Sequence, residues 1–227
     1  MKKPKVKELS FEATKSSGKV SALLIVPENA STLLVLGHGA GAGMRQRFME
    51  DIAYRLADQG IGTFRYQFPY IEIGMRRPDL KPILLTTVRS AVESATRVAD
   101  GLPLLAGGKS MGGRMTSNAC AEEPLPGVMG LVFFGFPLHP PKTPSTERAD
   151  HLQKVSIPML FLQGTRDDLA DLTLLKPICK KLGKRATLHV VDGADHSFHV
   201  LKSSGKTDEG VLDELAHTSR TWSDTLR

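Results

Sequence analysis

The sequence predicts an α/β fold: a mostly parallel, twisted sheet of about seven to eight strands with helices on both faces. From Thr32 onward, short apolar runs typical of buried strands alternate with longer segments whose apolar residues recur at helical spacing. Several of the apolar runs end in glycine-containing loops, as strands do where the chain turns. The 227 residues contain no repeat or linker, so we expect residues 1–227 to form a single domain.

The first third of the chain predicts an edge hairpin followed by a strand, a helix and a strand. Segments 6–13 and 19–26 are extended in character and are separated by a Ser-Ser-Gly turn, which favours an antiparallel pair. Residues 32–36 form a compact apolar strand that stops in a glycine-rich loop. A helix is expected over about residues 45–59, because its apolar side chains recur every four positions, and residues 61–68 return to strand character.

The middle of the chain leads into a serine held between a strand and a helix. Residues 70–82 are expected to be a polar, arginine-containing connection, and residues 83–99 a helix with one apolar face. Pro103 then opens a short apolar strand that runs to Ser110. The following helix is expected from Met111 to about Ala121, because Pro124 disfavours helical geometry in the residue before it.

The last third predicts three more strands and the helices that connect them. Strands are expected over residues 128–136, 158–163 and 186–191, with a proline-rich loop and a short helical piece between the first two. That connection is too short for a large helical lid, so we expect an open or shallow pocket. A helix over residues 172–182 is expected to kink or restart at Pro177, and an amphipathic helix is expected over residues 208–225.

Gly108-Lys109-Ser110-Met111-Gly112 matches the Gly-x-Ser-x-Gly pattern of a nucleophile elbow. The flanking glycines matter because larger side chains would collide at a sharp turn that holds the serine hydroxyl clear of the backbone. Ser110 is therefore the candidate nucleophile, and the alternative is a passive serine in a glycine-rich turn. A phosphate-binding P-loop is excluded because Pro103 stands where that motif requires glycine. The glycines at 37–43 imitate a dinucleotide motif, but no ribose-binding acid follows, so we expect no cofactor.

An acid and a histidine follow Ser110 at the ends of later predicted strands. Ligands bind outside the carboxyl ends of strands in parallel sheets, so these loops are expected to meet. His196 can take the proton of the serine hydroxyl, and Asp167 can hold the other imidazole nitrogen. Asp168 and Asp171 are the rival acids. Backbone N–H groups of Met111 and Ala40 are the candidate oxyanion-hole donors.

These motifs together resemble the α/β-hydrolase superfamily, and its small, lid-poor members related to dienelactone hydrolase. The resemblance covers nearly the whole chain. It implies an eight-stranded type of sheet, a Ser-His-Asp triad and hydrolysis through an acyl-enzyme. Dienelactone hydrolase itself carries a cysteine nucleophile where this chain has Ser110, so its particular substrate is not implied. The segments that carry the resemblance are Gly37-His38-Gly39-Ala40-Gly41, Gly108-Lys109-Ser110-Met111-Gly112, Phe161-Leu162-Gln163-Gly164-Thr165-Arg166-Asp167 and Gly193-Ala194-Asp195-His196-Ser197-Phe198.

Other polar residues near these loops have a substrate-binding and a structural interpretation. His139, Arg76 and Arg77 are candidates for contact with substrate, although a structural role for His139 is an equal alternative. For His38 we expect a hydrogen bond that stabilises its loop. Lys109 and Arg114 could bind an anion, but long basic side chains are more often solvated, so solvation is expected. The sequence also allows Asp167 to pair with Arg166 or to cap the next helix.

Composition narrows the classes of partner. The formal net charge of +6 is spread along the chain, so a solvated basic surface is favoured over nucleic-acid binding. Cys120 and Cys179 lack the spacing of a metal site or disulfide framework, and no metal is expected. No segment has the roughly 20 apolar residues that span a bilayer, and no signal peptide is recognisable, so a cytoplasmic location is expected.

We therefore expect a serine hydrolase that cleaves a small ester, thioester or lactone through an acyl-enzyme on Ser110. The alternative is a protein of the same fold that binds or scaffolds without turnover, because a fold does not guarantee an activity. The expected partner is a small-molecule substrate, and the sequence leaves the oligomeric state and the acyl and leaving groups open.

Overall fold

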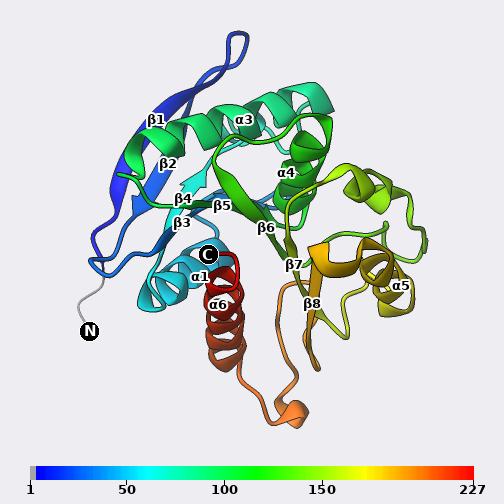
Figure 1. Cartoon of the computed structure of the whole chain (residues 1–227). Coiled ribbons are helices and arrows are strands. Elements are labelled where there is room, and N and C mark those ends of the chain that lie inside the picture. The colour runs from blue at the N-terminus through cyan, green and yellow to red at the C-terminus, as the bar shows by residue number, and fades with distance from the viewer. Residues whose placement is uncertain (1–3) are drawn as a thin grey trace.

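The computed structural model describes residues 4–227, and an eight-stranded sheet forms its centre (Figure 1). In chain order the strands are β1 (Lys7–Thr14), β2 (Gly18–Ile25), β3 (Thr32–Gly37), β4 (Ile61–Tyr66), β5 (Leu104–Lys109), β6 (Val128–Phe134), β7 (Met159–Gly164) and β8 (Ala186–Val191). They lie in the order β1-β2-β4-β3-β5-β6-β7-β8. β2 is antiparallel to both β1 and β4, and every other pair is parallel. The predicted edge hairpin and mostly parallel sheet are confirmed.

Helices cover both faces of this sheet, as the alternating pattern predicts. α1 (Arg47–Asp58) and α6 (Asp208–Asp224) pack together on one face. On the other face lie α3 (Lys81–Val98), α4 (Met111–Glu122) and α5 (Leu172–Leu182) (Figure 1). Shorter helical pieces are α2 (Pro69–Glu72), η1 (Glu147–Lys154), η2 (Gly183–Arg185) and η3 (Lys202–Ser204).

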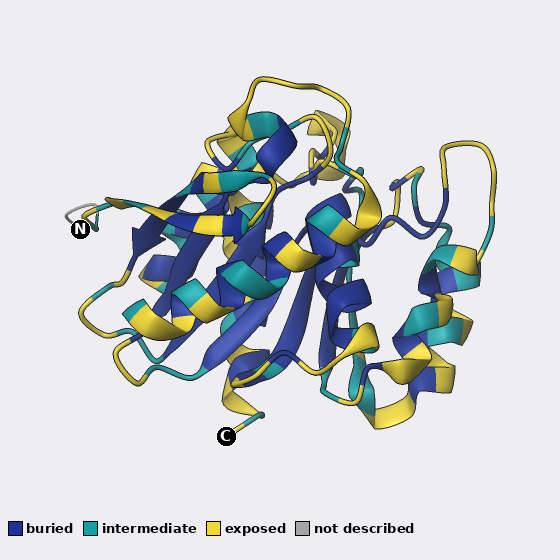
Figure 2. Cartoon of the chain, turned by 90° about the horizontal axis from the view of Figure 1, so that it is seen from above, coloured by how far each residue is buried: buried dark blue, intermediate teal, exposed yellow. Residues whose placement is uncertain are grey.

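Each face of the sheet has its own apolar core. Side chains of α3, α4 and α5 pack with one set of strand residues, and those of α1 and α6 pack with the other set. Every residue of β3, β4, β5 and β7 is buried, so these strands are covered on both faces (Figure 2). In β3 and β7 this burial gives near-continuous apolar runs rather than alternation, which explains why the sequence could locate these two strands.

The strand register brings four glycine-containing loops to one edge of the sheet. Gly37 of β3 lies opposite Gly108 of β5, and Gly164 of β7 lies opposite Val191 of β8. The chain leaves each of these strands at its carboxyl end, where ligands bind in open α/β sheets. The loops that carry the candidate acid, the candidate histidine and the elbow serine therefore leave the sheet at the same edge.

Two details differ from the sequence expectations. Residues 70–82 were expected to be irregular, but α2 occupies Pro69–Glu72, because proline suits the first position of a helix and disrupts only later ones. α5 runs without a break through Pro177, so it does not restart there. The connection between β6 and β7 contains only η1 as regular structure, in agreement with the absence of a large lid. None of the helices in residues 4–227 has the length and apolar character needed to cross a lipid bilayer.

Candidate active site

Ser110 occupies the sharp turn between β5 and α4. Its backbone has φ 51° and ψ −116°, a conformation that residues other than glycine rarely adopt. The turn is held by two hydrogen bonds: the Ser110 N–H donates to the Phe134 carbonyl at 3.1 Å, and the Arg114 N–H donates to the Ser110 carbonyl at 3.1 Å. The surrounding structure thus maintains strain at the position where a nucleophile elbow requires it.

The glycines around Ser110 allow two backbone segments to touch. A Cβ on either Gly108 or Gly112 would collide with the Gly37 carbonyl at the end of β3. A Cβ on Gly39 would lie 3.7 Å from the Ser110 Cβ, so the loop after β3 runs directly beside the serine. The Gly-x-Ser-x-Gly spacing is therefore required here by the close approach of β3, β5 and α4.

A chain of two hydrogen bonds links the serine, histidine and aspartate. His196 Nε2 lies 2.9 Å from Ser110 Oγ, and His196 Nδ1 lies 2.8 Å from Asp167 Oδ2. Because an ionised carboxylate only accepts, Nδ1 carries the hydrogen and Nε2 is free to accept from the serine hydroxyl. The Asp167 side chain is 1% exposed and that of His196 is 20% exposed, so the acid lies inside and the base near the surface.

Asp167 is held by two further donors. The Leu169 backbone N–H donates to Oδ1 at 2.8 Å, and the Gln163 side-chain amide donates to Oδ2. Gln163 itself is fixed because its Oε1 accepts the Phe136 N–H at 3.0 Å. Gln163 is not among the residues that the sequence pattern predicts for the site, although a single amide at the end of an otherwise apolar strand is an unusual residue to bury.

The rival acids point elsewhere. Asp168 is exposed. Asp171 caps α5 by accepting the Thr173 backbone N–H at 2.7 Å, and its hydrogen bonds from Thr173 lower its pKa. Arg166 donates to the Gly193 carbonyl at 3.0 Å rather than to Asp167. Of the three candidate acids, Asp167 is the one that bonds to His196.

One candidate oxyanion donor directly follows the serine in sequence, and the other lies in the loop after β3. Met111 is the first residue of α4, so its N–H has no acceptor within the helix. Ala40 lies in the loop after β3, whose next residue, Gly41, donates its N–H to the Tyr70 hydroxyl at 3.3 Å. This loop passes the serine and is tied to α2 at its far side.

His38 fixes the start of the same loop, as the sequence analysis expected. Its Nε2 accepts the Phe68 N–H at 3.1 Å, and its Nδ1 donates to the Gly39 carbonyl at 2.8 Å. Burial lowers the pKa of His38 to about 4, so the ring is neutral at pH 7. Both ring nitrogens are therefore committed to backbone groups.

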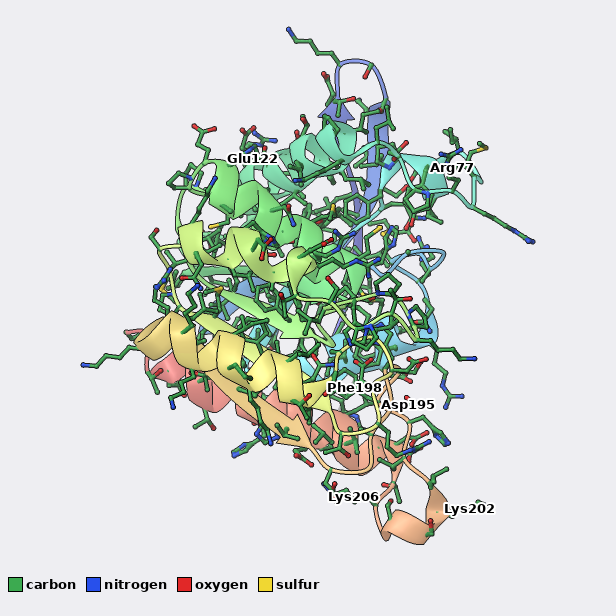
Figure 3. All side chains as sticks on the ribbon, turned by 90° about the vertical axis from the view of Figure 1, so that its right-hand side faces the viewer. Arg77, Glu122, Asp195, Phe198, Lys202 and Lys206 are labelled. Carbon is green, nitrogen blue, oxygen red and sulfur yellow. The ribbon has the colours of Figure 1, made fainter. Side chains whose placement is uncertain are left out.

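The three candidate substrate-binding residues are placed differently. His139 Nδ1 bonds to the Pro140 carbonyl at 2.9 Å, and its Nε2 accepts the Asp171 N–H at 2.9 Å, so both ring nitrogens hold backbone. Arg76 and Arg77 are exposed. The loop after β8 that carries His196, residues 192–200, is called the histidine loop. Figure 3 shows Arg77 on a projecting segment, well separated from Asp195 and Phe198 on this loop.

Lys109 contradicts the expectation of a solvated side chain, and Arg114 is half-buried. Lys109 is 9% exposed, and its Nζ donates to the His196 carbonyl at 2.6 Å. Burial lowers its pKa to about 8. The Nε of Arg114 is buried without a hydrogen-bond partner among residues 4–227. The expectation of solvation is therefore wrong for Lys109.

Two further features concern ligands: a cavity near the candidate active site, and the arrangement of the side chains in residues 4–227 that could hold a metal ion. A cavity of about 730 Å³ lies beside the histidine loop, lined by residues of α1, by the start of α6 and by residues 197–199. Ser110 is not among the residues that line it. Within residues 4–227 no group of three or more His, Cys, Asp and Glu side chains is arranged to hold a metal ion.

Comparison with known proteins identifies the family. A family model that describes an alpha/beta hydrolase domain matches residues 30–224. The chain belongs to the α/β-hydrolase domain family. The resemblance expected from the motifs is thereby confirmed, and so is the fold. The eight-stranded sheet is accordingly that of an α/β hydrolase.

Solved structures with the same fold cover nearly the whole chain. Dienelactone hydrolase from Anabaena variabilis is 20% identical, with 97% of each chain covered and a TM-score of 0.76. A lidless α/β serine hydrolase from Xanthomonas campestris is 18% identical, with 96% of this chain and 95% of that chain covered and a TM-score of 0.73. Est1E from Butyrivibrio proteoclasticus is 16% identical, with coverage of 96% and 98% and a TM-score of 0.71. At these identities the likeness shows the shared fold.

Proposed function

We propose that this α/β hydrolase is a serine hydrolase that cleaves a small ester, thioester or lactone through an acyl-enzyme on Ser110. The observation that carries the proposal is the hydrogen-bond chain from Ser110 Oγ to His196 Nε2 at 2.9 Å and from His196 Nδ1 to Asp167 at 2.8 Å. A serine hydroxyl is a weak nucleophile at neutral pH, and a base within hydrogen-bond distance activates it.

The proposed first half-reaction forms the acyl-enzyme. Ser110 Oγ attacks the acyl carbon while His196 Nε2 takes the hydroxyl proton, and Asp167 stabilises the imidazolium that results. The tetrahedral intermediate collapses as the bond to the leaving group breaks and His196 returns the proton to that group. From an ester or thioester an alcohol or thiol leaves, and the acyl group stays on Ser110; from a lactone the new hydroxyl group remains on the acyl chain that Ser110 carries.

The second half-reaction repeats the proton transfers with water. His196 removes a proton from water, the hydroxide attacks the acyl carbon, and the Ser110 oxygen recovers its proton as the carboxylic acid departs. In both halves the N–H groups of Met111 and Ala40 are proposed to bind the oxyanion. Each such donor contributes about 10²–10³ in kcat where its geometry is right.

The choice of a small substrate rests on the connection between β6 and β7 and on the fold's relatives. That connection carries η1 and no larger helical lid. Proteins of the same fold include a dienelactone hydrolase, an esterase domain from a Rhodothermus marinus protein, and Est1E, one structure of which has ferulic acid bound. A lactone and simple esters are therefore the first substrates to test on this chain.

The proposal also includes one domain over residues 1–227 and a cytoplasmic location. The single sheet, which takes strands from Lys7 to Val191, supports the first part. The two cysteines, Cys120 and Cys179, are both buried and unpaired, which suits a reducing compartment. Burial raises the pKa of Cys179 to about 11, so its thiol is protonated and unreactive.

A panel of short p-nitrophenyl esters, alkyl thioesters and lactones tests the proposal. We expect the purified protein to hydrolyse at least one class and the Ser110→Ala variant to lose that turnover while keeping its fold, as judged by circular dichroism. Turnover that persists in Ser110→Ala would contradict the assignment of the nucleophile. A folded protein with no turnover on any member would favour the binding or scaffold alternative.

A further inference from the structure

We propose that Lys109, the variable residue of the elbow, is a positioning residue that tethers the loop carrying His196 and so holds the imidazole over Ser110. This inference rests on the proposed function and deepens it. The Gly-x-Ser-x-Gly pattern assigns no role to this position. In this chain it connects the strand that ends at the nucleophile to the loop that supplies the base.

The tether is one short hydrogen bond between segments 87 positions apart. Lys109 Nζ donates to the His196 carbonyl at 2.6 Å, so the ammonium binds the backbone of the residue whose ring contacts Ser110. A hydrogen bond from a charged donor is shorter and stronger than one between neutral groups. Lys109 is the last residue of β5 and directly precedes Ser110. The end of this strand therefore positions Ser110 through the backbone and His196 through the Lys109 side chain.

Two aromatic rings also lie close to the ammonium. Lys109 Nζ lies 5.8 Å from the ring centroid of Phe48 on α1 and 5.6 Å from that of Phe198 on the histidine loop. The two rings stack with centroids 5.7 Å apart and planes at 16°. Both distances fall within the range of cation–π attraction, so Lys109 also holds Phe198 against the body of the protein.

The histidine loop has a conformation that needs such support. Phe198 has φ 63°, an uncommon value for a bulky residue, and the loop closes through a bridge between Ala194 and Val200. Gly135, which follows β6, leaves room for this arrangement: a Cβ there would lie 3.1 Å from Lys109 Nζ and 3.3 Å from His196 Nδ1. The ammonium and the imidazole therefore border the same small space.

The charged groups that face Lys109 come from two loops. Asp167, on the loop after β7, and Asp195, on the loop after β8, both favour the ammonium, whereas burial opposes it. Burial has the larger effect and lowers the pKa of Lys109 to about 8. His196 is a further titratable residue in contact with Lys109, and the Phe48 and Phe198 rings are uncharged.

The pH dependence follows from these contacts. Above about pH 8 the ammonium becomes an amine, and its bond to the His196 carbonyl loses the charge-assisted component. The tether weakens, and we expect kcat to fall by about fivefold on this alkaline limb. An arginine at the same position stays charged throughout, so the limb should move upward in Lys109→Arg.

The test measures kcat and KM against pH for the wild type, Lys109→Met and Lys109→Arg, with Lys15→Met as the control. Lys15 is an exposed lysine in the turn between β1 and β2. In Lys109→Met we expect kcat at pH 7 to fall about 10- to 100-fold, with KM within about twofold. Lys109→Arg should recover part of kcat. Faster hydrogen exchange over residues 195–200 should accompany the loss in Lys109→Met, and Lys15→Met should match the wild type.

The following outcomes would refute the proposed role of Lys109. A Lys109→Met variant with unchanged kcat and unchanged loop exchange would refute it, as would an alkaline limb at the same pH in the wild type and Lys109→Arg. If Lys109→Met does not fold, the comparison of the wild type with Lys109→Arg decides. A wild type that lacks turnover on every ester would refute the proposed function instead, and unchanged loop exchange in Lys109→Met would then refute the tether independently.

Discussion

Replacement of Asp167 by asparagine removes one charge and exchanges an acceptor for a donor in a site with no room for it. In the wild type, Asp167 Oδ1 accepts the Leu169 N–H at 2.8 Å, and Oδ2 accepts from both Gln163 and His196. An asparagine has one oxygen and one NH₂ group, so it cannot accept on both sides.

No orientation of the asparagine satisfies every neighbour. If its oxygen faces Leu169, its NH₂ group faces the Gln163 amide and forces His196 Nδ1 to become an acceptor. The hydrogen then moves to Nε2, which can no longer take the Ser110 proton. A flip of Gln163 would relieve that clash but would turn its NH₂ group toward the Phe136 N–H, which now donates to Oε1 at 3.0 Å. If the oxygen faces His196, the Leu169 N–H loses its acceptor.

The magnitudes follow from this geometry. One unsatisfied buried donor costs about 1–3 kcal/mol of unfolding free energy, which urea denaturation can measure. The wrong imidazole tautomer should lower kcat/KM by about 10⁴-fold, the loss seen when asparagine replaces a triad aspartate. Asp168→Asn is the matched control, because it makes the same change one residue away on an exposed side chain. A kcat/KM within tenfold of the wild type in Asp167→Asn, or an equal loss in Asp168→Asn, would refute the reasoning.

Two further predictions concern stability. Gly112→Ala should unfold at a lower temperature and lose activity, because its Cβ would collide with the Gly37 carbonyl oxygen, a backbone atom. Gly210→Ala, in the exposed first turn of α6, should keep both, because its Cβ would meet only the Thr207 hydroxyl at 3.2 Å, and a side chain can shift. A melting temperature of Gly112→Ala equal to that of the wild type would contradict the steric account. The second concerns His38, whose pKa burial lowers to about 4 from an ordinary 6.5, so the unfolded chain binds the proton first. The contribution of His38 to the free energy of unfolding should be complete above pH 6.5 and should fall by about 3 kcal/mol toward pH 4. Urea titrations should show a smaller loss over this pH range in His38→Gln. A loss as large as that of the wild type would contradict the contribution of His38.

The sequence predicted the order and type of the main elements because the strands are apolar and the helices have one apolar face. Burial on both faces makes β3 and β7 continuous runs of large side chains, which stand out from the amphipathic helices. The Gly108–Gly112 motif also had a physical cause that sequence expresses directly, since only glycine permits the contact with Gly37. Where backbone sterics permit only glycine, the restriction is visible in the amino-acid sequence itself.

Contacts between distant segments were not predictable in the same way. Lys109 was expected in solvent, because nothing near it in sequence suggests that Phe48, Phe198 and the His196 carbonyl surround it. The role of Gln163 was not predictable for the same reason, since its side chain meets Asp167 only in the folded loop after β7. Side-chain direction within that loop depends on tertiary packing.

The short polar segments show a related limit. Asp167, Asp168 and Asp171 are equivalent in composition, and only backbone geometry turns the first toward His196 and the last toward Thr173. His139 was a candidate for substrate contact, yet both of its ring nitrogens bond to backbone groups in the loops it joins. Residue type alone does not distinguish a histidine that meets substrate from one that holds two loops together.

The central claim is that Ser110 is an activated nucleophile, and covalent labelling tests it most directly. The folded protein is incubated with a fluorophosphonate, and the adduct is counted and located by mass spectrometry of the intact chain and its peptides. We expect one probe per chain on Ser110, no adduct in Ser110→Ala, and a much slower reaction in Asp167→Asn, because His196 then lacks the correct tautomer. An unlabelled wild type, or a label on another residue that survives in Ser110→Ala, would contradict the claim.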